Sequence, residues 1–242
     1  MSTARPAIVV GAFDYGESDR ILTLLTPADG RVRVLARRAR ASKKRFAGLL
    51  DLGTELRAQI SRGRGDLSVL SDAERVRGPD RARQAWDRLP WLFYGCEVCS
   101  ALAPESAEAT KLFKLLQTWL ALLEEAAPSL ASGWALEAKA LTFAGLAPGL
   151  VRCAECGEPI DDPAMFSVAA GGALHARCGG GRPVGVEALH ALEALRRTPL
   201  ADTVTSSPPD LPRGLLADAI EAQLSRRLES RAFLSTVQAT GR

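Results

Sequence analysis

The sequence has no long apolar segment, few aromatic residues and an odd number of cysteines. No run approaches the roughly 18 to 20 apolar residues that a membrane-spanning helix needs, so we expect no membrane segment. The first residues do not show the charged, apolar and small-residue pattern of a secretory leader, and five cysteines cannot all pair. We therefore expect a cytoplasmic chain whose thiols are reduced and available to a metal.

The sequence also lacks the motifs of common enzymes. It contains no phosphate-binding P-loop, no Gly-x-Ser-x-Gly nucleophile motif and no His-Glu-x-x-His metal motif. The order of motifs argues against a zinc deaminase, because its His-x-Glu comes before Pro-Cys-x-x-Cys, whereas here a Cys-x-x-Cys pair comes first. Asp161 and Asp162 precede a proline and fit a solvated turn better than acid–base chemistry. We predict that the chain is not an enzyme.

One short segment concentrates positive charge. Residues 1–90 hold 18 Lys and Arg against 11 Asp and Glu, whereas the remainder holds 13 against 17. Eight of the fifteen residues from 31 to 45 are basic and none is acidic. Many basic runs are only solvated loops, but such a concentration is also typical of surfaces that bind phosphates. The basic residues are Arg31, Arg33, Arg37, Arg38, Arg40, Lys43, Lys44 and Arg45.

The first 78 residues read as five short strands, at residues 7–12, 20–26, 31–36, 54–61 and 67–75. In the third strand Arg31 and Arg33 share one face and the valines share the other, so the basic side chains continue from a sheet face into the following loop. Five strands with tight turns predict an oligonucleotide-binding (OB-fold) barrel, although periodicity alone does not exclude an SH3-like barrel. We expect Arg62 and Arg64 at the edge of the basic surface.

From residue 79 to 242 the apolar period becomes helical, and this predicts an α+β chain with an N-terminal barrel domain and a helical domain. Apolar residues recur at three- and four-residue intervals between Leu112 and Leu123, which predicts an amphipathic helix there. Further helices are expected from about 134 to 145, from 186 to 197 and from 212, with a loop at 203–212.

A zinc-ribbon-like knuckle is predicted within the helical domain, at about 150–183. Its two pairs of ligands are Cys153 with Cys156 and His175 with Cys178, spaced as in zinc ribbons. Three thiolates and one imidazole fill a tetrahedron and leave no position for a catalytic water, so one structural Zn²⁺ is expected per chain. The alternative is four unliganded side chains that only pack.

The other Cys-x-x-Cys pair, Cys96 and Cys99, has no partner pair. It falls on the apolar side of a predicted helix rich in aromatic residues, so we expect both thiols to pack in the core and not to form a redox motif. His190 has no acid or nucleophile nearby and is expected at the surface or its boundary.

Several segments, in this order and spacing, resemble the bacterial RecO family of DNA repair proteins. They are the Ala7-Ile-Val-Val opening, Tyr15-Gly-Glu-Ser-Asp-Arg20, the Gly30 strand with its basic loop, Lys111-Leu-Phe-Lys-Leu-Leu116, and Phe143-Ala-Gly-Leu-Ala-Pro148 before Cys153. The resemblance implies a recombination mediator that binds single- and double-stranded DNA and anneals complementary strands. It also implies partnership with RecR and with the C-terminal tail of single-strand-binding protein (SSB) in loading RecA. Members with a metal usually have four cysteines, so His175 is a departure.

Residues 1–78 contain only Phe13, Tyr15 and Phe46 as aromatics, so we expect contacts to the DNA backbone to dominate, with steep salt dependence. Two alternatives remain open at this point. The chain could be a zinc-ribbon adaptor that acts mainly through protein contacts, or an RNA-binding barrel protein, since a groove that reads backbone charge separates RNA from DNA poorly.

Overall fold

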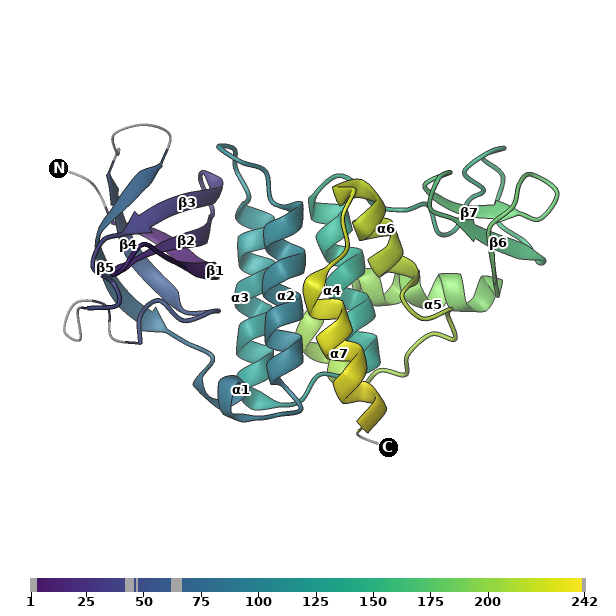
Figure 1. Ribbon diagram of the computed structural model, residues 1–242. Helices are drawn as coiled ribbons and strands as arrows, with labels where there is room; N and C mark the ends of the chain where they lie inside the picture. The colour runs from purple at the N-terminus through teal and green to yellow at the C-terminus, as the bar shows by residue number, and fades with distance from the viewer. Residues whose placement is uncertain (1–3, 42–45, 47, 62–66, 241–242) are drawn as a thin grey trace. The chain divides into compact units, whose positions relative to one another are not determined.

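The computed structural model describes residues 4–41, 46, 48–61 and 67–240. The chain divides into two compact units, one of Met1–Ala126 with Ser230–Arg242 and one of Ala127–Glu229 (Figure 1). The first unit holds the barrel and the helices α1, α2, α3 and α7, and the second holds the remaining elements. None of the described helices combines the length and the apolar character that a bilayer crossing requires.

The N-terminal strands form a closed barrel in the order β1-β2-β3-β5-β4. Neighbouring strands are antiparallel except for β3 and β5, which run parallel. This arrangement, in which the fifth strand returns to lie between the third and the fourth, confirms the predicted five-stranded barrel of the OB type. The strands are β1 Arg5–Tyr15, β2 Asp19–Thr26, β3 Gly30–Ala36, β4 Glu55–Ser61 and β5 Ser68–Arg77.

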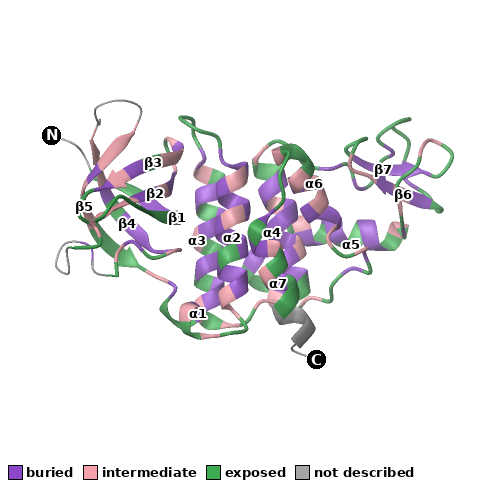
Figure 2. Ribbon diagram, in the orientation of Figure 1, coloured by how far each residue is buried: buried purple, intermediate pink, exposed green. Residues whose placement is uncertain are grey.

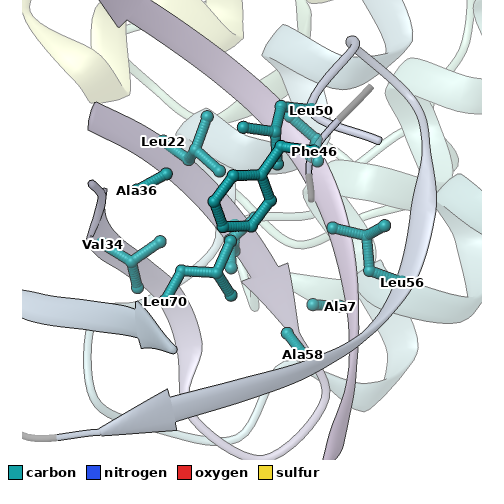
Figure 3. Packing of buried hydrophobic residues seen from close by; sticks show 11 residues of the cluster. Ala7, Leu22, Val34, Ala36, Phe46, Leu50, Leu56, Ala58 and Leu70 are labelled. Carbon is teal, nitrogen blue, oxygen red and sulfur yellow. The ribbon is translucent and has the colours of Figure 1, made fainter. Parts of the chain in front are cut away.

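The barrel interior is filled by inward-facing aliphatic side chains around the ring of Phe46 (Figure 3). Val34 on β3 and Leu22 on β2 are fully buried and lie in this cluster, whereas Arg33 between the inward positions is exposed. The predicted alternation along β3 is therefore confirmed. Phe46 comes from the loop after the basic segment and is 4% exposed. Its ring is consequently a core residue, and Phe13 and Tyr15 are the aromatics left on the barrel surface.

Three helices follow the barrel in the first unit, and the C-terminal helix joins them: α1 Asp80–Gln84, α2 Leu89–Leu102, α3 Thr110–Glu125 and α7 Glu229–Thr240. Most of α2 is buried (Figure 2). Gly95 on α2 gives space to the buried indole of Trp119 on α3, whose Nε1 donates a hydrogen bond to the carbonyl oxygen of Trp91 at 3.0 Å. The core of these helices is thus fixed by a polar contact as well as by apolar area.

Cys96 and Cys99 are both fully buried on α2, and neither forms a disulfide. Burial raises the pKa of the Cys96 thiol to about 12 and that of Cys99 still further. A thiol that stays protonated and inaccessible is not a redox nucleophile, so the prediction of plain core packing is confirmed.

The start of β3 is fixed against the connection between α2 and α3. The backbone N–H of Arg31 donates to the carbonyl oxygen of Pro104 at 2.8 Å. Gly30 has a φ of +62°, and a Cβ atom there would lie 2.1 Å from the same oxygen. This close approach requires glycine, and it sets the position of the strand that carries the basic segment.

The second unit consists of helices and a small sheet in the order β7-β6-β8. Its helix α4 begins earlier than the predicted residue 134, because the hydroxyl of Ser129 accepts a hydrogen bond from the backbone of Ser132 and caps the first turn. A 3-10 helix also occupies the beginning of the predicted loop at 203–212. The elements are α4 Leu130–Phe143, β6 Ala164–Ser167, β7 Gly172–His175, β8 Arg182–Val184, α5 Val186–Arg197, η1 Leu200–Thr205 and α6 Leu215–Leu224.

Candidate nucleic-acid interface and metal centre

Two of the predicted DNA-contact residues are engaged by carboxylates of the same unit. The guanidinium of Arg31 lies 2.8 Å from Oε1 of Glu105, in the connection between α2 and α3. Arg40 lies 3.5 Å from Oδ2 of Asp14 and donates to the carbonyl oxygen of Glu17. These acids come from distant parts of the sequence and offset part of the positive charge that the run carries.

Arg33, Arg37 and Arg38 are exposed, and none has an ion pair among the residues that the structure describes. They are therefore available to phosphates. The other predicted contacts, Lys43, Lys44 and Arg45, lie outside the described residues, as do Arg62 and Arg64.

The loop after β3 is held against the turn between β1 and β2. The carboxylate of Asp19 accepts a hydrogen bond from the backbone N–H of Arg38 at 2.7 Å, and the carbonyl oxygen of Ser18 accepts one from Arg40 at 3.0 Å. Arg38 has a left-handed φ of +54° in this loop. These bonds keep Arg38 and Arg40 next to the β1–β2 hairpin, so these two cations belong to a defined surface.

Two aromatic side chains lie on the same hairpin. Phe13 is 46% exposed and Tyr15 is 54% exposed. The guanidinium carbon of Arg33 lies 5.8 Å from the centre of the Phe13 ring, within cation–π range. The sequence shows that Phe13 and Tyr15 are two of the three aromatic residues in the barrel domain. Only the strand register shows that they lie on the same surface as the basic residues.

The four predicted metal ligands come together in the second unit. The sulfur atoms of Cys153, Cys156 and Cys178 and a ring nitrogen of His175 all lie within 4.8 Å of one another. Nδ1 of His175 is 3.4 Å from the sulfur of Cys156 and 3.7 Å from that of Cys178. A tetrahedral zinc with ordinary bond lengths separates its N and S ligands by about 3.6 Å. The two His175 distances match this spacing, and the four side chains together form a cluster that could hold a metal ion.

Short loops and one strand place these ligands. The backbone N–H of Cys153 donates to the carbonyl oxygen of Glu158, and that of Gly157 donates back to the carbonyl of Cys153. Gly157 turns this knuckle with a φ of +76°. The other pair begins at the end of β7, where the N–H of Cys178 donates to the carbonyl of His175.

The imidazole of His175 is buried, and its Nε2 atom, on the side away from the thiols, also has partners. Nε2 lies 2.9 Å from the carbonyl oxygen of Pro159 and 3.2 Å from the carboxylate of Asp161. The carbonyl can only accept, so Nε2 carries the proton and the lone pair of Nδ1 faces the thiols. An outer carboxylate of this kind orients metal-bound histidines. Sequence reasoning assigned Asp161 to a solvated turn, and only the fold places its carboxylate at the histidine.

The pKa values of the Cys153 and Cys178 thiols are shifted in opposite directions. Burial alone would raise the pKa of Cys153, but hydrogen bonds from the backbone of Cys156, His175 and Glu155 lower it to about 6. Burial and the neighbouring cysteine sulfurs raise the pKa of Cys178 to about 11. One thiolate is thus favoured, and further thiolates beside it are disfavoured by repulsion. A bound dication removes this conflict, because it stabilises all the thiolates together.

The remaining candidates are surface groups. His190 is exposed on α5, as expected. Asp162, next to Asp161, accepts a hydrogen bond from the backbone of Val186 at the start of α5 and so has a structural contact.

Comparison with known proteins adds independent evidence. The family descriptions "Recombination protein O N terminal" and "Recombination protein O C terminal" match residues 1–79 and 83–232. The chain is 38% identical over 241 residues to the DNA repair protein RecO of Anaeromyxobacter dehalogenans (strain 2CP-C), with 95% of this chain and 94% of the relative covered. It is 37% identical over 243 residues to that of Myxococcus xanthus, with 96% of each covered. Identity to the Geobacter sulfurreducens protein is 35% over 232 residues, with 94% of this chain and 95% of the relative covered.

Proposed function

This chain belongs to the RecO family of DNA repair proteins, and from that premise we propose that it is a recombination mediator without enzymatic turnover. Membership of the family supports a role in DNA repair and recombination. The finer proposal is that the chain binds single- and double-stranded DNA, anneals complementary strands, and acts with RecR to load RecA onto DNA coated with SSB. We further propose that it contacts the C-terminal tail of SSB.

The observation that carries the DNA-binding part is the set of three exposed arginines on and after β3. Arg33, Arg37 and Arg38 extend from the face of a closed barrel, and no carboxylate among the described residues pairs with them. Guanidinium groups bind phosphate oxygens through two parallel N–H donors. A surface that contacts the phosphates in this way tolerates any base sequence, as a mediator acting on arbitrary DNA requires.

Charge also gives a physical basis for annealing. Two single strands repel each other through their phosphates, and a protein that neutralises phosphates on both strands lowers that repulsion. The basic segment is suited to this because it offers cations without reading base edges. Lys43, Lys44 and Arg45 belong to the same proposed contact, although they lie outside the described residues. Arg31 and Arg40 take part when DNA phosphates displace Glu105 and Asp14.

We propose that the metal of the second unit is one structural Zn²⁺ held by Cys153, Cys156, His175 and Cys178. The donor set supports zinc, since thiolate and imidazole ligands at tetrahedral spacing suit this ion. Four protein ligands leave no place for a reactive water. The proposed contribution of the metal is therefore the folding of residues around β6, β7 and β8.

Strand annealing on SSB-coated DNA tests the proposal. Two complementary labelled oligonucleotides coated with SSB should anneal faster with this protein, and added salt should slow the reaction. A variant with Arg33→Gln, Arg37→Gln and Arg38→Asn should lose most of the acceleration. The matched control is Arg81→Gln, Lys111→Gln and Lys114→Gln, which removes equal charge from exposed positions on α1 and α3. No acceleration by the wild type at any salt would contradict the mediator and favour an adaptor.

A further inference from the structure

The outer face of the β1–β2–β3 sheet carries two exposed aromatic rings beside the basic residues. Phe13 and Tyr15 are two residues apart on β1, so their side chains point to the same face of the sheet. In the strand register Phe13 pairs with Ile21, and Thr23 of the neighbouring strand pairs with Arg33. Rings and cations therefore occupy adjacent rows of one surface.

The packing of the barrel core does not explain why these two rings are on the sheet surface. The barrel core surrounds the ring of Phe46 (Figure 3). Neither Phe13 nor Tyr15 belongs to this cluster of described residues. Roughly half of each side chain is accessible. Two rings held on a paired strand, with Arg33 against one of them, form a preorganised apolar surface next to a cationic one.

The spacing of the two rings favours single-stranded over double-stranded nucleic acid. Alternate side chains on a strand are about 6.6 Å apart, whereas stacked bases in a duplex strand rise by about 3.4 Å. Only a strand whose bases are unstacked from one another can place successive bases on both rings. A duplex also hides its base faces between neighbouring pairs, so it can meet the arginines but not the rings.

We infer that Phe13 and Tyr15 are a stacking platform for unpaired bases, which gives this surface a preference for single strands over duplex. The inference rests on the proposed function, because the arginines must first bring a polynucleotide to the barrel. It adds base stacking to the backbone contacts that the sequence predicts will dominate. The rings add a contribution that depends on the presence of bases and not on charge.

Three probes of equal length separate the two contributions: an oligothymidylate, an abasic strand with the same phosphates, and a blunt duplex. The wild type should bind the oligothymidylate more tightly than the abasic strand. In the double variant Phe13→Ala, Tyr15→Ala that affinity should fall about 25-fold, from roughly fivefold per base at the low end of base–aromatic stacking. Its affinities for the abasic strand and the duplex, and the salt slopes, should not change.

Conservative variants test whether the aromatic face is the cause. Tyr15→Phe should bind like the wild type, whereas Phe13→Leu, which keeps apolar bulk, should lose affinity for the oligothymidylate. Trp86→Ala is the matched control, since Trp86 is an exposed aromatic on the helical part of the same unit. Thermal melting of each variant confirms that the fold is kept.

The outcomes distinguish this inference from the function on which it rests. If the wild type binds the oligothymidylate and the abasic strand equally, the stacking platform is refuted while charge-driven DNA binding stands. An equal loss of the double variant on the duplex refutes it as well. If the wild type binds none of the three probes, the proposed DNA-binding function itself fails.

Discussion

Replacing the exposed arginines Arg33, Arg37 and Arg38 should weaken DNA binding most at low salt. The variant carries Arg33→Gln and Arg37→Gln, which keep the side-chain length without charge. Asparagine is chosen at Arg38 because this residue has a φ of +54°, a conformation that asparagine tolerates better than most residues. The fold should be unaffected, since the three side chains are exposed.

The size of the effect follows from how many phosphate contacts are lost. Each contact to single-stranded DNA contributes about 0.7 to the log–log slope of affinity against salt, so three contacts contribute about 2. The ratio of wild-type to variant affinity should then shrink about 20-fold between about 50 and 200 mM salt. Arg31 and Arg40 are left out of this count, because Glu105 and Asp14 already pair with them.

Fluorescence anisotropy of a labelled oligothymidylate over a salt series measures this slope directly. The charge-matched control with Arg81→Gln, Lys111→Gln and Lys114→Gln should keep the wild-type slope. If the arginine variant keeps the wild-type slope, these residues do not contact phosphates. If the control loses as much as the arginine variant, the effect comes from net charge, and the proposed surface is wrong.

Three further predictions concern the metal, the helical core and the acidic neighbours of the basic loop. With zinc bound, a thiol reagent should label none of the five cysteines quickly, chelation should release three thiols, and denaturant should release all five. Gly95→Ala places a Cβ 2.2 Å from Nε1 of the buried Trp119 and should lower the unfolding free energy in urea by about 2 to 4 kcal/mol. Asp14→Asn frees Arg20 and Arg40 and should raise single-strand affinity several-fold, with a salt slope steeper by about 0.7 for each arginine that reaches a phosphate.

Each of these has a control and a contrary result. Fewer than three thiols released by the chelator would contradict the ligand set. Gly185→Ala, where an added Cβ meets nothing within 4 Å, should cost little, and equal destabilisation by both glycine variants would refute the clash with the indole. Asp72→Asn removes the same charge from an exposed position on β5, and an equal gain from it would show that Asp14 has no special role.

Local patterns were sufficient to predict the barrel and the clustering of three cysteines with one histidine. Strict alternation marks β3, where Val34 is buried and Arg33 exposed, and turn residues mark its ends. The two-residue spacing within each ligand pair predicts Cys153, Cys156, His175 and Cys178, because such spacing turns both side chains onto one ion. These patterns depend only on residues close together in the sequence, so the folded structure preserves them.

Contacts between distant residues could not be predicted in this way. Glu105 lies 74 residues after Arg31 and meets it only because the connection between α2 and α3 packs against the start of β3. Asp161 reaches His175 through the fold of the knuckle. Phe46 lies in a loop where no periodicity assigns a face, so only the closed barrel shows that its ring fills the core. The effective charge and the aromatic surface of the interface are therefore tertiary properties.

The combination of cations and stacking rings bears on how annealing proceeds. Rings that stack on base faces leave the edges that pair with a complementary strand exposed, so a bound strand can still recognise its complement. Once the duplex forms, its bases stack on one another and lose the contacts with Phe13 and Tyr15, while contacts with the arginines remain possible. Under the proposed stacking and phosphate contacts, the protein holds the reactant strand through both contributions and the product through charge alone. Because charge contacts weaken with salt, the difference favours release of the duplex over release of unpaired strands.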